Sequence, residues 1–194
     1  MEKMVIALDV DGTLYDGGVV AEAATLALQR ARADGHTLVI VTGRRWESLR
    51  QVVPTVVGLC DRAVCEEGGV LVDVATGELV LLAEPVEPAV VAGLLAAGVP
   101  ELDVGHVVVG APSAWIATVE AVRAATGSRR HLVVNKASVA LAPEGCDKGT
   151  GLRAAVAELG VAGIEFDRFG GFVFFSDPAG NTVELQQDPE LLPG

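Results

Sequence analysis

The chain has 194 residues, enough for one sizeable domain with a small addition. Apolar residues make up 51% of it, which excludes a chain too polar to bury a core. Acidic residues outnumber basic ones by 26 to 14, and the resulting net charge of −12 argues against nucleic acid or an anionic membrane surface as a partner.

Short apolar runs alternate with helical segments in the first part of the chain. We predict strands at Met4–Leu8, Thr37–Val41 and Arg62–Cys65, helices at Ala21–Asp34 and Trp46–Val53, and a hairpin of Val70–Asp73 with Leu79–Leu82. This order predicts right-handed crossovers and a Rossmann-like α/β core with a parallel sheet. Ligands bind such sheets at the carboxyl ends of the strands.

After Glu84 the pattern changes to a compact α+β insertion. Its expected elements are a helix at Ala89–Ala97, an apolar segment at Val104–Val109, a helix at Ser113–Thr126, and strands at His131–Asn135 and Ser138–Ala142. We therefore divide the chain into a core of residues 1–83 and 144–162 and an inserted cap of residues 84–143. A helix is expected at Gly151–Leu159. The run Arg129-Arg130-His131 is a candidate for contact with an anionic substrate from the cap, with a solvated turn as the simpler interpretation.

Residues 163–194 form a distinct tail. An apolar strand starting at Phe172 leads into a turn rich in Pro, Gly and Asn, and a β-branched strand around Val183 follows. This pattern predicts a C-terminal β-hairpin.

Two carboxylates, Asp9 and Asp11, come directly after the first predicted strand. Residues two apart on a strand point to the same side, and burying two like charges is costly unless a cation lies between them or one acid keeps its proton. Gly12 lets the backbone approach a ligand, and Thr13 adds a hydroxyl. This position favours a functional site over an ordinary Asp-Gly turn.

The residues Asp9-Val10-Asp11-Gly12-Thr13-Leu14 resemble motif I of the haloacid-dehalogenase-like superfamily of phosphohydrolases. The resemblance continues in the same order through residues 39–44 (VIVTGR, motif II), 67–71 (EGGVL) and 147–152 (DKGTGL, the motif III region). It covers roughly residues 4–160 and is nearest to the Cof-type, sugar-phosphatase-like group, whose cap lies between motifs II and III.

The resemblance implies a magnesium-dependent phosphohydrolase of small phosphorylated metabolites, such as a sugar phosphate or a phosphoglycolate-like ester. Asp9 would be the nucleophile that forms an aspartyl-phosphate, and Asp11 the general acid and base. Thr42 and the Gly43 amide would hold phosphate oxygens, and Lys148 would neutralise charge. Mg²⁺ would bridge Asp9, the Asp11 carbonyl and the phosphate, and the cap would select the leaving group.

Three of these residues have simpler interpretations. Thr42 at a strand end is also typical of a helix N-cap, and a lysine before glycine, as at Lys148, is commonly solvated. Arg44 fits a structural ion pair as well as a substrate ligand.

The family's fourth motif, which supplies a further magnesium acid after the last core helix, is not recognisable. Asp177 follows an apolar strand and would be the substitute metal ligand. Alternatively, the chain joins two unrelated pieces, which the turn chemistry favours, and is a weak or inactive relative. Residues 174–185 (FFSDPAGNTVEL) resemble the closing hairpin of vicinal-oxygen-chelate, glyoxalase-like proteins, in which the acid matching Glu184 binds a metal. A metal-binding glyoxalase-like module is thus a further alternative, with an exposed strand acid as the simpler interpretation of Glu184.

Cysteine usage and the search for targeting signals indicate the cellular compartment of the protein. The three cysteines, Cys60, Cys65 and Cys146, are odd in number and lack metal-ligand spacing, which favours reduced thiols. The N-terminal apolar run is too short for a signal peptide, and no run is long enough to span a bilayer. We expect a cytoplasmic protein, with its oligomeric state left open.

Overall fold

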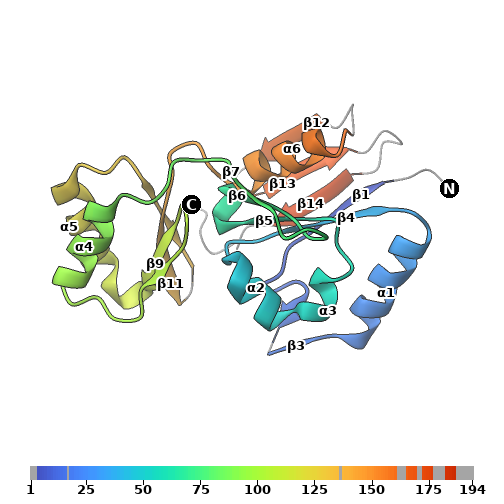
Figure 1. The fold of residues 1–194 in the computed structure, drawn as a ribbon, viewed down its shortest axis with the longest axis horizontal. Helices are drawn as coiled ribbons and strands as arrows, with labels where there is room; N and C mark the ends of the chain where they lie inside the picture. Colours follow the sequence, from blue (N-terminus) through green and yellow to red (C-terminus); the bar gives the residue numbers. More distant parts are fainter. Residues whose placement is uncertain are drawn as a thin grey trace.

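The computed structural model describes residues 4–16, 18–135 and 137–160, together with the backbone of three later strands at 165–169, 172–176 and 182–186. Within these residues the chain forms a core around one sheet, a cap with its own sheet, and a third sheet from the later strands (Figure 1). None of the helices in these ranges has the length and apolarity that crossing a membrane requires.

The core sheet has five strands in the order β1-β4-β5-β6-β7. Their bounds are β1 Val5–Leu8, β4 Thr37–Val41, β5 Arg62–Cys65, β6 Val70–Asp73 and β7 Leu79–Leu81. The first three are parallel, whereas β5, β6 and β7 pair antiparallel. The predicted α/β class is therefore confirmed, with the expected hairpin making the sheet mixed.

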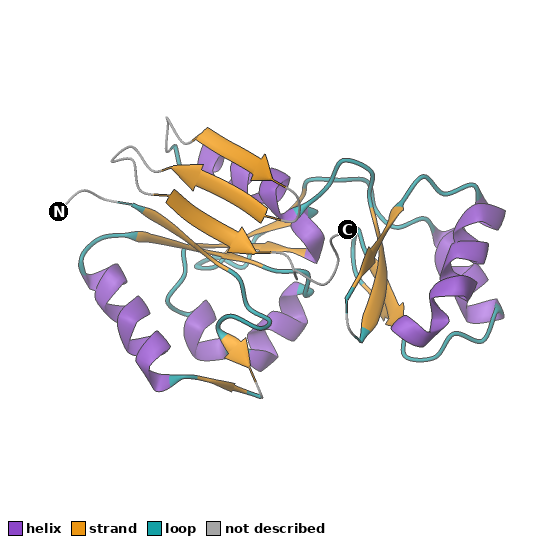
Figure 2. Ribbon diagram, turned by 180° about the vertical axis from the view of Figure 1, so that it is seen from behind, coloured by secondary structure: helices purple, strands orange, loops and turns teal. Residues whose placement is uncertain are grey.

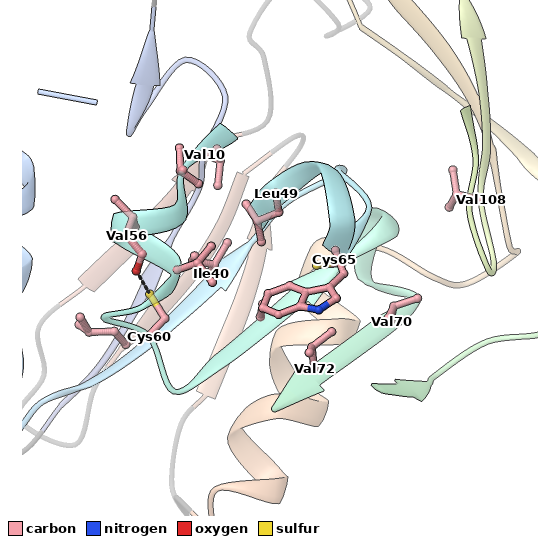
Figure 3. Packing of buried hydrophobic residues seen from close by; sticks show 14 of the residues in the cluster. Val10, Ile40, Leu49, Val56, Cys60, Cys65, Val70, Val72 and Val108 are labelled. Carbon is pink, nitrogen blue, oxygen red and sulfur yellow. Dashed lines mark hydrogen bonds between the residues drawn. The ribbon is translucent and has the colours of Figure 1, made fainter. Parts of the chain in front are cut away.

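Helices cover both faces of this sheet. The helices are α1 Glu22–Ala33, α2 Trp46–Val52, α3 Pro54–Val57 and, on the other face, α6 Lys148–Glu158 (Figure 1). In β4 the side chains alternate, so Leu38 and Ile40 pack with the first three helices while Val39 and Val41 pack with α6. Figure 3 shows Ile40 among the buried side chains of the first cluster. A strand buried on both faces explains its uninterrupted apolar sequence.

The cap contains a four-stranded antiparallel sheet in the order β10-β11-β9-β8, with two helices packed together beside it (Figure 2). Its elements are α4 Pro88–Ala96, β8 Asp103–Val104, β9 Val109–Pro112, the 3₁₀ turn Ser113–Trp115, α5 Ile116–Thr126, β10 His131–Val134 and β11 Ser138–Ala142. The apolar segment Val104–Val109 is thus divided between two strands and the loop of residues 105–108.

Two small features were not predicted. A two-stranded sheet, β2 Tyr15–Asp16 and β3 Val19–Val20, follows the acid pair, and a 3₁₀ turn, Glu66–Gly68, follows β5. Two-residue strands are too short to leave a periodic signal in a sequence.

The tail forms a three-stranded antiparallel sheet, β12 Glu165–Phe169, β13 Phe172–Ser176 and β14 Thr182–Gln186. The pairing of β13 with β14 confirms the predicted hairpin, while β12 was not predicted. β14 lies beside β1, which is the edge strand of the core sheet within the described residues. Asp177 lies outside the described residues, and so does the rest of the turn between β13 and β14.

All three cysteines are buried and free, as the odd count predicted. Burial raises the pKa of Cys60 to about 12 and that of Cys146 to about 11. These thiols therefore stay protonated at neutral pH.

Candidate active site

The carboxyl ends of β1, β4 and β5 meet at a cavity of about 910 Å³ between the core and the cap. The core contributes Asp9, Asp11, Gly43, Arg44, Glu67 and Lys148 to its lining. Residues of β9 and β11, including Gly110 and Ser138, line it from the cap. Parallel strands deliver their following loops to one edge, so residues far apart in sequence converge here.

Asp9 and Lys148 form the most buried ion pair on the floor of this cavity. Lys148 Nζ lies 2.9 Å from Asp9 Oδ1, and the side chains are 22% and 13% exposed. Burial by itself would lower the pKa of Lys148, but the charges of Asp9 and Glu67 raise it on balance. Lys148 is therefore a fixed cation and not a solvated lysine.

The start of α6 determines where Lys148 lies. Asp147 is the N-cap: its Oδ1 accepts a hydrogen bond from the Thr150 amide at 2.8 Å, while its own amide donates to Thr150 Oγ1 at 2.9 Å. This reciprocal capping box makes Lys148 the first helical residue, three residues before the predicted start. The helix N-terminus then adds its own partial positive charge beside Asp9.

Asp11 has a cation of its own. Arg44 donates from Nε to Asp11 Oδ2 at 2.8 Å and from Nη2 to Oδ1 at 2.7 Å, while the Asp11 side chain is 54% exposed. The hydrogen bond to Asp11 raises the pKa of Arg44. Both acids follow β1 in a loop and do not lie within the strand, so the expected crowding of two strand carboxylates is replaced by two separate ion pairs. Arg44 is the ion-pair partner, and it also lines the cavity.

Thr42 and Gly43 follow β4. Thr42 is buried, and its Oγ1 accepts a hydrogen bond from the Arg44 amide at 3.2 Å. It is not the cap of α2, because that helix begins at Trp46 with Arg45 as the N-cap residue. At Gly43 a Cβ would overlap Glu67 Oε1, so any larger residue there would have to displace the Glu67 carboxylate.

Glu66 and Glu67 were not predicted as site residues, although Glu67 begins one of the matched segments. Both are buried, and both have positive φ, at 52° and 55°. Burial raises the pKa of Glu67, with Asp9 and Asp11 adding to the effect and Lys148 opposing it. The sequence signal that could have identified them is the pair of consecutive acids at the end of a buried parallel strand.

The oxygen donors suit Mg²⁺ in chemical type. Asp9 contributes a carboxylate and Asp11 a carboxylate and a carbonyl, and Mg²⁺ commonly uses one or two protein carboxylates together with water and substrate phosphate. No group of three acidic, histidine or cysteine side chains within the described ranges is placed to hold a metal ion. The proposed third ligand, Asp177, lies outside these ranges, and for Glu184 only the backbone is described.

Comparison with known proteins concerns the family and the fold. A family model described as haloacid dehalogenase-like hydrolase matches residues 6–117. Among solved structures, a haloacid dehalogenase-like hydrolase from Bacteroides thetaiotaomicron has a TM-score of 0.67 at 13% identity, with 82% of this chain and 78% of that chain covered. One from B. subtilis has a TM-score of 0.62 at 16% identity, with 82% and 80% covered.

A third similar structure is described as a subclass IIB sugar phosphatase of the same superfamily. It has a TM-score of 0.61 at 15% identity and covers 82% of this chain and 76% of that one. No curated protein matches the chain significantly. At these identities the structural likeness concerns the fold alone.

Proposed function

The chain belongs to the haloacid dehalogenase-like hydrolases, and from that premise we propose that it is a magnesium-dependent phosphohydrolase of small phosphorylated metabolites. The observation that carries the proposal is the Asp9–Lys148 pair on the floor of the cavity, 139 positions apart in sequence and 2.9 Å apart in space. A partly buried carboxylate next to a fixed cation is suited to attack on an anionic ester, because the cation offsets the repulsion between nucleophile and phosphate.

In the proposed reaction, Asp9 attacks the phosphorus in line. A bond forms between an Asp9 oxygen and phosphorus, and the bond from phosphorus to the leaving oxygen breaks. Asp11 gives a proton to the departing alcohol. It then takes a proton from the water that hydrolyses the aspartyl-phosphate, which returns Asp9 to its carboxylate form.

Other residues position the reacting groups and stabilise the charge on the phosphoryl group. Lys148 and the Gly43 amide face the phosphoryl oxygens, and Arg44 orients the half-exposed Asp11 carboxylate. When bound, Mg²⁺ would be held by Asp9 and Asp11 and would offset charge on the phosphoryl group. The cap wall formed by β9 and β11 would contact the leaving group, which gives it a part in substrate choice.

One observation favours a second candidate, a relative that binds phosphate but turns over weakly. Within the described residues no third acid joins Asp9 and Asp11, and the loss of one ligand-shell partner typically costs 10–100-fold in metal affinity or activity. Measured turnover with saturating magnesium distinguishes the two candidates.

The test is hydrolysis of p-nitrophenyl phosphate with and without Mg²⁺. We expect Asp9→Asn to lower turnover by at least about 1000-fold, because the nucleophile is lost. Asp34→Asn, an exposed acid after α1, is the matched control and should retain activity. Mass spectrometry of acid-quenched wild-type enzyme should find a phosphoryl group on the peptide containing Asp9. Unchanged turnover in Asp9→Asn would exclude the mechanism.

A further inference from the structure

Glu66 connects the core to the cap through its carboxylate. Its Oε2 accepts hydrogen bonds from the amides of Val107 at 2.8 Å and Val108 at 3.2 Å, and its Oε1 accepts one from His106 at 3.1 Å. The residue is 1% exposed. Three consecutive amides of one cap loop thus converge on a single buried core carboxylate, and hydrogen bonds to a charged acceptor are among the stronger ones.

The surrounding backbone fits this contact closely. A non-glycine residue with positive φ is strained, and Glu66 keeps that conformation at the end of β5. A Cβ at Gly105 would overlap the Glu66 carboxylate, and a Cβ at Gly69 would overlap Val107. Val107 is fully buried within the main core cluster. The 105–108 loop is therefore inserted into the core and forms part of its buried cluster.

This insertion attaches the cap to the core independently of the two chain connections near residues 83–87 and 143–147. The loop leads directly into β9, whose residues Gly110 and Pro112 line the cavity. The next residue after Glu66 is Glu67, which lies against Gly43 in the same cavity. Of these two adjacent residues, Glu66 therefore contacts the cap loop, and Glu67 contacts the part of the cavity near Gly43 where we propose that the phosphate binds.

We propose that Glu66 is a positioning residue that holds the 105–108 loop, and with it the β9 wall, at a set distance from Asp9, so that the preference for the leaving group depends on it. The reaction-related part of this proposal rests on the proposed function. Glu66 lines the cavity, but both of its carboxylate oxygens accept hydrogen bonds from cap amides, so the role we propose is to position the loop and not to bind substrate. Its removal should alter recognition of the alcohol part of an ester while leaving recognition of phosphate intact.

The experiment compares wild type with Glu66→Gln, whose amide group places a donor among three N–H donors. Hydrogen exchange of the 106–108 amides, followed by mass spectrometry, should become about tenfold faster or more. KM for p-nitrophenyl phosphate should rise several-fold. KM for acetyl phosphate, with a small leaving group, and inhibition by inorganic phosphate should stay within about twofold.

Gly105→Ala disturbs the same contact from the cap side and keeps the glutamate, so it covers the case in which Glu66→Gln does not fold. Glu78→Gln, an exposed core acid, is the control and should leave every readout unchanged. Slow exchange at 106–108 in both variants would overturn the proposal. So would a loss of phosphate inhibition as large as the change in ester KM. If the wild type hydrolyses no ester, the proposed function fails, while the exchange data still decide whether Glu66 holds the loop.

Discussion

At the scale of single residues, the site is an arrangement of one partly buried lysine among several carboxylates. Lys148 contacts Asp9 directly, and the charge of Glu67 helps to raise the pKa of Lys148. An unpaired buried carboxylate is costly, so Lys148 stabilises the folded chain as well as the proposed reaction. Both consequences can be tested separately.

Replacing Lys148 should abolish most phosphate recognition. We expect Lys148→Met to lower kcat/KM for p-nitrophenyl phosphate by about 100- to 1000-fold, which is the typical effect of losing one preorganised charge-stabilising donor. Inhibition by inorganic phosphate should weaken as well. The control is Arg153→Met, an exposed cation on the same helix, which should keep near wild-type kinetics. Equal losses in the two variants would point to a general effect of charge.

The raised pKa of Glu67 predicts a pH-dependent stability. In the folded chain this acid keeps its proton over a range where the unfolded chain has already lost it, so its stabilising effect is complete below about pH 4.3 and is lost as pH rises through the raised pKa. Glu67→Gln cannot ionise. Urea unfolding between pH 4 and pH 8, without magnesium, should therefore show a shallower fall in stability for Glu67→Gln. Parallel curves for the two proteins would contradict this cause.

At the scale of helices and strands, local sequence was a good guide wherever burial follows a simple pattern. Thr37–Val41 was predicted with its observed bounds, because a strand covered on both faces is apolar throughout. The bend at residues 105–108 could not be predicted, since its amides are satisfied by Glu66, 40 or more positions away. Asp9 and Lys148 were found from an ordered set of motifs. Glu66 was not, because a pair of acids after a strand does not by itself indicate that one of them binds the amides of a loop 40 positions away.

The packing of α6 on the core gives an element-scale prediction. A Cβ at Gly151 would lie 2.5 Å from Val64 Cγ1 and 2.7 Å from Gly68 Cα, so Gly151→Ala must displace the helix. We expect a loss of about 1–3 kcal/mol in the free energy of unfolding, and lower activity, because Lys148 moves with the helix.

The matched control is Gly58→Ala. Gly58 has φ −64°, and its Cβ would meet nothing closer than the Pro54 carbonyl oxygen at 3.6 Å. Alanine there should be neutral or stabilising by about 0.4–1 kcal/mol, since it restricts the unfolded chain. Urea unfolding of both variants provides the comparison, and equal destabilisation would show that the close approach at Gly151 is unimportant.

At the scale of the whole molecule, the cap and core share a buried cluster in addition to the two chain connections that join them. Val107, Val108 and Ala142 from the cap belong to the buried cluster that includes Ile40 and Cys65 of the core. Arg45 and Asp103 form an ion pair from core to cap beside the cavity. These contacts indicate that the cavity shape is set by packing at the junction as well as by its lining residues.

Arg130, expected from the sequence to lie in a solvated turn, is instead 4% exposed at this junction. It donates to the carbonyls of Pro85 at 2.7 Å and Glu84 at 3.1 Å, and it pairs with Glu87. It also donates to the carbonyl of Val107, which is fully buried. Arg130→Met should therefore lower the free energy of unfolding by about 1–3 kcal/mol, because it leaves this buried carbonyl without its donor and removes the hydrogen bonds to the more exposed Glu84, Pro85 and Glu87. The neighbouring Arg129 is 86% exposed in its pair with Glu144, so Arg129→Met should cost less than about 1 kcal/mol. Urea unfolding measures both effects. A small loss in Arg130→Met would mean that water replaces the arginine at the connection between cap and core, and that this side chain does not hold the two together.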